Sequence, residues 1–198
     1  ALAAVIVVLI GQPTTSDKWQ ALEPDKAPLL AERAVQIHPG ELLDALHSDA
    51  LKVILLDIRN EADYNIFHIA GARRVTLAEL SDLIPALLLE PANTIFVTVS
   101  NDETAATEAW KVLVAESVPN VYILEGGINN WISVFGREEP SLQPMAASPG
   151  DDLLRYTFDA ARGDRYDAAD PAPHEWTLEY TPKIELQRPQ RPSGGGCG

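Results

Sequence analysis

Short apolar runs alternate with helix-length segments through the middle of this chain. The runs lie at residues 35–37, 53–56, 95–99 and 121–124, and polar residues do not alternate with apolar ones inside them. Such runs are typical of strands that are buried on both faces. The segments between them that read as helices are residues 39–46, 76–89 and 102–114. Alternation of strands with helices predicts an α/β domain built on a parallel sheet that helices cover.

The first ten residues, ALAAVIVVLI, are all apolar, and no charged residue precedes Asp17. Ten residues are fewer than the roughly 20 that a membrane-spanning helix needs. We interpret them as the end of a signal-anchor helix; the end of a secretory hydrophobic region and a buried strand are the alternatives. We therefore expect a membrane anchor at residues 1–16 that contacts the membrane through residues 1–10. The polar stretch with two prolines at residues 17–33 is predicted to be a linker.

The composition changes after the α/β region, and residues 138–198 are predicted to form an extended tail rich in proline and glycine. Within the tail, Trp176, Leu178 and Tyr180 alternate with polar residues, which predicts a strand-like segment at residues 176–186 with one apolar face. An uncovered aromatic strand promotes aggregation, so we expect this face to be docked on the domain or on another protein. These three side chains are the candidate partner-binding residues.

Composition and charge exclude several classes of function. The 198 residues carry a formal net charge of −14, which is unsuited to binding a phosphate backbone, so no nucleic-acid partner is expected. The single cysteine, Cys197, excludes a disulfide within the chain and a thiolate zinc site. It lies in the terminal sequence SGGGCG, which is either a processing or lipid-attachment site or an ordinary flexible end. The four histidines lack metal-ligand spacing, and no phosphate-binding glycine motif occurs, so no metal or cofactor is expected.

Two motifs lie where chemistry is expected in such a fold. Asp57 and Arg59 follow a buried strand, and sites of open α/β sheets gather at the carboxyl ends of strands. Gly71 marks one tight turn, and the pair at residues 126–127 marks another that opens a short helix ending at Trp131.

Together, these motifs resemble the rhodanese-like domain family. Its pattern is Asp-x-Arg, then Glu and Tyr, then Gly-His-Ile-x-Gly-Ala, and later Leu-Glu-Gly-Gly-x-x-x-Trp. The matching positions here are Asp57, Arg59, Glu61, Tyr64, His68, Ile69, Gly71, Ala72, Leu124, Glu125, Gly126, Gly127 and Trp131. Phe67 stands where the family usually has glycine. The resemblance implies a rhodanese-like open parallel sheet of about five strands over residues 34–137. It also implies that Asp57, Arg59 and His68 have structural roles.

The loop expected to carry the chemistry departs from the family pattern. Active relatives have Cys-x-x-Gly-x-Arg-Ser here, in which a cysteine thiolate takes up sulfur and loop N–H groups hold the anion. In this chain the loop comprises Ser100, Asn101, Asp102, Glu103 and Thr104, with Ser100 at the cysteine position. A serine forms no persulfide. Asp102 and Glu103 place negative charge where thiosulfate or phosphate would bind, which predicts that the domain is not an enzyme.

We therefore expect a non-catalytic accessory or scaffold subunit of a larger membrane protein complex, respiratory or photosynthetic. Its partners would be other protein subunits, bound through the N-terminal and C-terminal extensions. An acidic, cysteine-poor domain on a membrane anchor suits the periplasm or an organelle lumen. One alternative is an enzyme, either a sulfurtransferase with an unusual nucleophile or a hydrolase that uses Ser100, although no G-x-S-x-G motif surrounds it. Another is a small-ligand-binding module that uses the vestigial pocket for a neutral or cationic ligand.

Overall fold

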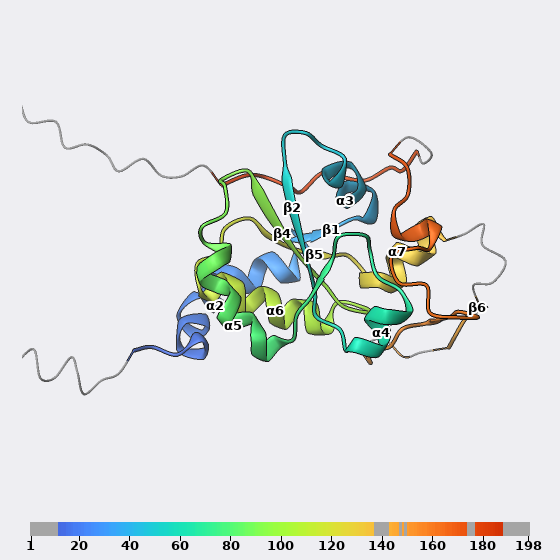
Figure 1. Cartoon of the computed structure of the whole chain (residues 1–198). Helices are drawn as coiled ribbons and strands as arrows, with labels where there is room; N and C mark the ends of the chain where they lie inside the picture. The colour runs from blue at the N-terminus through green and yellow to red at the C-terminus, as the bar shows by residue number, and fades with distance from the viewer. Residues whose placement is uncertain (1–11, 137–142, 147, 149, 174–176, 188–198) are drawn as a thin grey trace, which may run out of the picture.

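The computed structural model describes residues 12–136, 143–146, 148, 150–173 and 177–187. A five-stranded parallel sheet with the order β1-β5-β4-β2-β3 forms the centre of the molecule (Figure 1). Its strands are β1 (Gln36–Ile37), β2 (Lys52–Asp57), β3 (Arg73–Arg74), β4 (Thr94–Val99) and β5 (Val121–Leu124). The expected open parallel sheet of about five strands is therefore confirmed.

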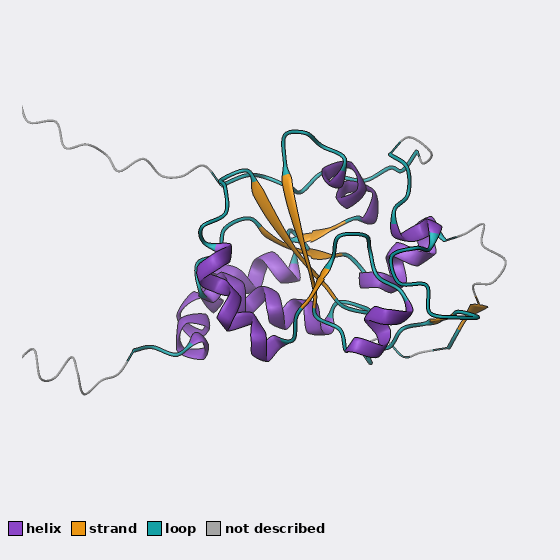
Figure 2. Ribbon diagram, viewed as in Figure 1, coloured by secondary structure: helices purple, strands orange, loops and turns teal. Residues whose placement is uncertain are grey.

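Helices cover both faces of this sheet (Figure 2). One face is covered by α2 (Thr15–Ala31), α5 (Leu77–Leu87) and α6 (Thr104–Ala115); the other is covered by α3 (Pro39–Leu46), α4 (Glu61–Ile66) and α7 (Gly127–Phe135). Because neighbouring side chains of a strand point to opposite faces, Phe96 of β4 packs under α5 and α6, whereas Val97 packs under α3 and α7. Burial on both faces explains the unbroken apolar runs.

The three predicted helices form with slightly different ends. Residues 39–46 are helical as expected, and residues 76–89 and 102–114 shorten or shift to α5 and α6. Helix α5 begins at Leu77 because Thr76 caps it: the Thr76 hydroxyl accepts from the Glu79 N–H, and the Glu79 carboxylate accepts from the Thr76 N–H at 2.9 Å.

The expected linker at residues 17–33 is wrong, because most of it forms helix α2. A capping box between Thr14 and Asp17 starts the helix, and the Trp19 ring packs edge-on against Trp110 of α6 at 6.0 Å between centroids. Lys18 adds an ion pair with Glu116 at 2.5 Å. Packing and capping therefore hold a helix that contains two prolines and has little periodicity of its own.

The predicted membrane anchor lies mostly outside the described residues, which begin at position 12. Residues 15 and 16 of that segment form the first turn of α2. In the described parts of the chain, no helix combines the length and hydrophobicity that crossing a bilayer requires.

The chain after α7 folds back onto the domain, in contrast to the extended tail that we expected. Within residues 143–173, β6 (Gln143–Pro144) and β7 (Tyr156–Thr157) pair in antiparallel fashion, and a 3₁₀ turn, η1, covers Asp167–Ala169. Phe158 and Tyr166 pack against the Phe67 ring at 5.8 and 5.7 Å. The Trp131 indole donates a hydrogen bond to the Ala168 carbonyl at 2.5 Å. This part of the extension therefore completes the core under α7.

Residues 177–187, here called the strap, are extended but pair with no strand. Their N–H groups are bound by side chains instead: those of residues 183 and 184 donate to the Glu41 carboxylate at 2.6 and 2.7 Å, and that of residue 185 donates to the Tyr122 hydroxyl at 2.8 Å. This bonding explains why the strand-like alternation produces no strand. Trp176 lies outside the described residues, whereas Leu178 and Tyr180 pack against Gly40 of α3, so their apolar sides face their own domain.

Candidate functional site

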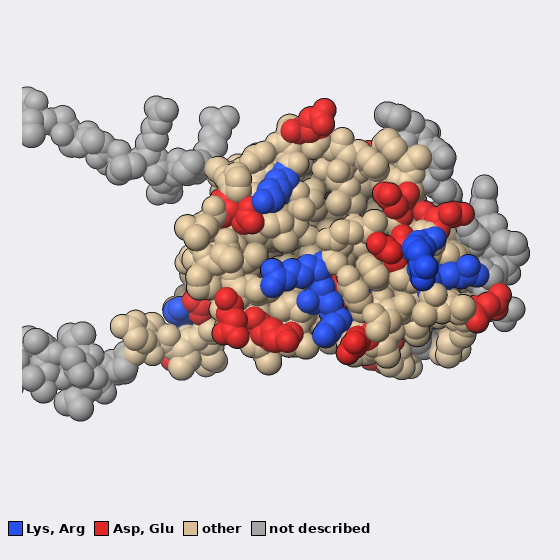
Figure 3. Space-filling model, viewed as in Figure 1, with Lys and Arg blue, Asp and Glu red and all other residues tan. Residues whose placement is uncertain are grey.

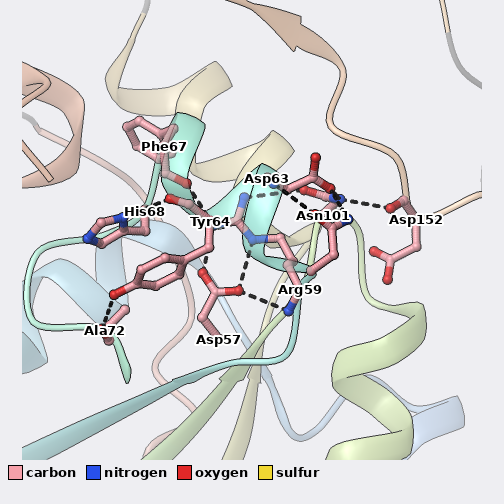
Figure 4. Close-up of polar contacts among 10 residues, drawn as sticks. Asp57, Arg59, Asp63, Tyr64, Phe67, His68, Ala72, Asn101 and Asp152 are labelled. Atoms are coloured by element: carbon pink, nitrogen blue, oxygen red, sulfur yellow. Dashed lines mark hydrogen bonds and ion pairs between the residues drawn. The ribbon is translucent and has the colours of Figure 1, made fainter. Parts of the chain in front are cut away.

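A buried ion pair stands at the carboxyl end of β2. Arg59 donates to both carboxylate oxygens of Asp57, at 2.9 and 2.6 Å, and the two side chains are 1% and 0% exposed (Figure 4). The remaining guanidinium donors reach the Phe67 carbonyl at 2.7 Å and the Asn101 amide oxygen at 3.3 Å. Arg59 thus ties β2 to the end of α4 and to the loop after β4, and the structural role of this pair stays a prediction.

His68 lies apart from the loop after β4. Its ring stacks on Tyr64 with 3.9 Å between centroids, and Nδ1 lies 2.8 Å from the Tyr64 carbonyl oxygen (Figure 4). The Tyr64 hydroxyl in turn donates to the Ala72 carbonyl at 2.7 Å, beside the turn at Gly71. These bonds hold the chain between α4 and β3, and the structural role of His68 stays a prediction.

The loop of residues 100–104 follows β4 directly and leads into α6. Ser100, at the predicted cysteine position, is fully buried, and its Oγ accepts a hydrogen bond from the Ala106 N–H at 3.2 Å. Asn101 is also buried and donates to Asp63 at 2.7 Å and to the backbone carbonyl of Asp152 at 2.8 Å. The loop is therefore held from inside the domain and from the C-terminal extension.

Asp102 and Asp152 bind the N–H groups at the start of α6. The Asp102 carboxylate accepts from Glu103 and Thr104 at 2.5 and 2.6 Å. The Asp152 carboxylate accepts from the N–H groups of Asp102 and Ala105 at 2.9 and 3.4 Å, and the Asp152 N–H returns a bond to the Asp102 carboxylate at 3.3 Å. Four consecutive N–H groups at a helix N-terminus, where negative charge is favoured, are thus taken by the chain's own carboxylates.

The two carboxylates shift each other's protonation in opposite directions. Burial raises the pKa of Asp152, and the nearby Asp102 carboxylate raises it further, against the hydrogen bonds from the Asp102 N–H and the Ser100 hydroxyl. Burial also pushes the pKa of Asp102 upward, but hydrogen bonds led by the Thr104 N–H outweigh it, so that pKa lies below its ordinary value. Asp152 should therefore take up a proton at a higher pH than Asp102.

Glu103 differs from its predicted role of repelling anions. Its carboxylate accepts from Arg33 at 2.7 Å and from the Gly126 N–H at 2.7 Å, so the Arg33 guanidinium compensates its negative charge. Helix α6 begins at Thr104 and not at residue 102, with Glu103 as its N-cap residue, and the Thr104 N–H donates to the Asp102 carboxylate outside the helix.

The double-glycine turn fits tightly against the loop. Gly126 and Gly127 have positive φ angles of 66° and 60°, and a Cβ on Gly127 would lie 2.0 Å from the Asp102 carbonyl oxygen. The next N–H groups, of residues 128 and 129, donate to the carbonyls of Ser100 and Asn101 at 2.9 and 3.0 Å. The N–H groups near the start of α7 therefore bind the loop, and only glycine at position 127 leaves room for the loop backbone. Trp131, one turn later, is fully buried.

A shallow hollow of about 360 Å³ opens beside the loop. Its lining mixes both signs of charge and comprises Arg33, Asp102, Glu103, Thr104, Gly126, Asn129, Gly150 and Arg155. Among the residues that the structure describes, no group of three or more His, Cys, Asp or Glu side chains is arranged to hold a metal ion.

Several residues that form this site were not predicted, namely Arg33, Asp63, Asn129, Gly150, Asp152 and Arg155. Asn129 joins α7 to the extension, since its amide donates to the Leu153 carbonyl at 2.9 Å and accepts from the Arg155 N–H at 2.7 Å. Asp152 lies 50 positions after Asp102 in the region predicted to be an extended tail, and no spacing in the sequence connects the two.

Comparison with known proteins matches this architecture to one family. A family model described as a rhodanese-like domain matches residues 38–133. A thiosulfate sulfurtransferase GlpE from Pseudomonas fluorescens is 30% identical over 95 residues, which cover 46% of this chain and 84% of that protein. The GlpE of Pseudomonas aeruginosa is 25% identical over 126 residues, 64% of this chain and 96% of its own. A solved structure from Lactobacillus plantarum is 24% identical, covers 56% of this chain and 93% of its own, and has a TM-score of 0.44. The chain belongs to the rhodanese-like domain family.

Proposed function

We propose that this rhodanese-like domain is non-catalytic and serves as an accessory or scaffold module. One observation carries the proposal: the loop that would hold the reactive cysteine and its anion has a buried serine, and Asp102 and Asp152 take its N–H groups. Sulfur transfer through a persulfide needs a thiolate, and a hydroxyl cannot replace it. This chain therefore shares its family with relatives named thiosulfate sulfurtransferase. It has Ser100 at the position where that reaction would need a cysteine nucleophile.

A hydrolase that uses Ser100 is the competing enzymatic hypothesis. The Asp152 carboxylate, which accepts from two N–H groups of the same loop, is the candidate base for this hypothesis. However, Ser100 is 0% exposed and lies beneath the segment that carries Asp152, so no substrate carbonyl or phosphorus reaches its Oγ in this arrangement. A nucleophile must contact its substrate, and for this reason we favour the non-catalytic proposal.

The proposed scaffold role extends to a membrane complex, respiratory or photosynthetic, in the periplasm or an organelle lumen. The apolar residues 1–10 support a membrane attachment. Both described ends of the chain lie at the amino-terminal edge of the sheet: Lys18 near the start of α2 contacts Glu116, just after α6, and the strap ends where the Gln187 N–H donates to Asn120, just before β5 (Figure 1). An anchor there would leave the loop of residues 100–104 facing away from the membrane.

Partner contacts in this proposal fall on the outward side of the strap, because Leu178 and Tyr180 face the domain. Thr177, Glu179 and Thr181 are exposed on the strap. On the face seen in Figure 3, acidic side chains are spread widely and basic ones gather in a few patches, in keeping with the net charge of −14. A partner that matches this surface would carry basic side chains.

Two measurements test the proposal. In a thiosulfate-to-cyanide sulfur-transfer assay, the wild-type chain should show no more turnover than a Ser100→Ala variant; wild-type turnover that Ser100→Ala abolishes would overturn the non-catalytic assignment. For the scaffold role, the protein should be extracted from its native membrane in mild detergent and run on a native gel, with co-migrating proteins identified by mass spectrometry. Stoichiometric co-migration with other subunits is expected, and migration as a lone 21.5 kDa species would refute it.

A further inference from the structure

Residues 150–155, here called the latch segment, return from the C-terminal extension to cover the loop of residues 100–104. Asp152 makes the direct polar contacts to that loop: its carboxylate accepts from the N–H groups of Asp102 and Ala105, its N–H donates to Asp102, and its carbonyl accepts from Asn101. Asp152 comes from outside residues 38–133, which match the family model. The contact is therefore a feature of this chain and its extension.

Polar contacts attach the latch segment at two points, and Leu154 adds apolar packing against the core. Leu153, next to Asp152, is 58% exposed, and the second polar attachment is the pair of hydrogen bonds between Asn129 and residues 153 and 155. Asp152 also has a φ of 50°, a left-handed backbone conformation that disfavours residues with a Cβ. These hydrogen bonds can be replaced by bonds to water or to another anion, and the backbone of Asp152 is strained. For both reasons the contact can detach while the core stays folded.

The Asp152 carboxylate occupies the place of an anionic ligand. The N-terminus of α6 presents consecutive N–H groups and the positive end of its dipole, which together attract oxyanions. Two of those N–H groups bind the Asp152 carboxylate, while the Asp102 carboxylate binds two more.

We propose that the latch segment is an autoinhibitory contact: the Asp152 carboxylate is an intramolecular ligand of the loop, and the loop is closed to external oxyanions until the latch segment detaches. This inference goes beyond the proposed scaffold role, because it concerns how the vestigial site is kept closed and not what the module binds elsewhere. Among the other charged groups around the loop, Glu103 is paired with Arg33 and Arg59 with Asp57, whereas Arg155, on the latch segment itself, donates to the Ser148 carbonyl at 3.4 Å. Asp63 accepts from Asn101. Asp152 is thus the carboxylate that leaves the loop when the latch segment detaches.

Inorganic sulfate is the probe that tests the latch. The Asp152→Ala change removes the intramolecular ligand, and adding Asp102→Asn removes the remaining carboxylate while keeping a side-chain oxygen to cap α6. Asp82→Ala, on the exposed side of α5, is the matched control because it removes the same charge far from the loop. Sulfate is titrated against chloride at constant ionic strength, and amide NMR shifts of residues 102–105 are followed.

The double variant should bind sulfate at least about ten-fold more tightly than wild type, because like charges near the site are removed and N–H groups are freed. The Asp82→Ala variant should behave as wild type. The proposal is overturned if wild type binds sulfate at these amides as tightly as the double variant, or if the double variant shows no sulfate-dependent shifts there.

A measurement on wild type alone covers the case in which the variants do not fold. In native-state hydrogen exchange, the N–H groups of Asp102 and Ala105, which bind Asp152, should exchange together and more readily than the central strand residue Val97. Exchange of both groups only through global unfolding, at the same rate as Val97, would contradict a detachable latch. Neither experiment measures sulfur transfer or partner binding, so its outcome is independent of the proposed function.

Discussion

The close fit between the double-glycine turn and the loop makes Gly127→Ala the most informative single substitution. The added Cβ would lie 2.0 Å from the Asp102 carbonyl oxygen and 2.4 Å from that of Ser100, and the closest approach that real Cβ atoms make is about 3.0 Å. The loop must therefore move by about 1 Å or the turn must open. Gly71→Ala is the matched control, because Gly71 also has a positive φ, of 77°, but a Cβ added there would meet no atom within 4 Å.

The expected magnitudes follow from these two geometries. At Gly71 the change adds only the cost of a Cβ in the left-handed region, about 1–2 kcal/mol. At Gly127 it adds the same cost and displaces the carbonyls that accept hydrogen bonds from residues 128 and 129. Each displaced bond is worth about 1 kcal/mol net and up to about 3 kcal/mol if a buried group is left unpaired. Gly127→Ala should therefore destabilise the domain by about 2–4 kcal/mol more than Gly71→Ala.

Urea unfolding followed by tryptophan fluorescence measures the difference, since Trp110 and Trp131 are both buried and report on opposite faces of the sheet. The midpoint should fall while the dependence on urea concentration stays unchanged. If the two glycine variants lose the same stability within about 0.5 kcal/mol, a margin typical of independent surface changes, then the turn does not brace the loop and the reasoning fails.

Three further predictions test other contacts. Asp57→Asn should lower the free energy of unfolding by about 3–5 kcal/mol, because it leaves the Arg59 charge buried without its partner; a loss below about 1 kcal/mol in urea would contradict the bracing role. Hydrogen bonding to Lys18 lowers the pKa of Glu116 from its ordinary 4.5, so its contribution should be complete above that pH and disappear as pH falls through the lowered pKa. The stability difference between wild type and Glu116→Gln should shrink on acidification, and a pH-independent difference would argue against it. Burial, with help from Asp44, raises the pKa of Tyr180 to about 12 from 10.0, so the strap should be stable below pH 10.0 and weaken as pH rises toward about 12. Burial also raises the pKa of Tyr64 and Tyr122, so the ultraviolet titration of tyrosinate is compared between wild type and Tyr180→Phe. The late absorbance change should be smaller in the variant, and an equal late change in both proteins would count against the assignment.

The sheet was predictable because each central strand is buried on both faces and so carries an unbroken apolar run. Helix α2 was not predictable, because Pro24 and Pro28 are typical of a linker. Its stability comes from the Thr14 cap and from the packing of Trp19 on α6. The strap differs from the predicted strand for a related reason. Its alternation is real, and one side does face the domain, but Glu41 and other side chains bind its N–H groups in place of a neighbouring strand.

The site was predictable only in the part that local sequence determines. Asp57 and Arg59 stand two positions apart at the end of a strand, so their pairing follows from short-range geometry. The contact between Asp102 and Asp152 has no such signal, since it joins two loops 50 positions apart and depends on how the extension folds back. A carboxylate that binds backbone N–H groups leaves no periodic pattern and no motif in the sequence.

The folded-back extension adds a second obstacle to sulfur transfer, beside the serine at the cysteine position. Ser100 removes the nucleophile, and that loss is visible in the sequence. Asp102 and Asp152 separately remove the anion-binding N–H groups, from residue 102 to residue 105, by binding them. A thiolate at position 100 would still lack a place for its anionic substrate, because the oxyanion and the Asp152 carboxylate compete for the same donors. The inactivity that we propose would thus rest on two features, of which only the second, a non-covalent contact, can be reversed by a change of conformation.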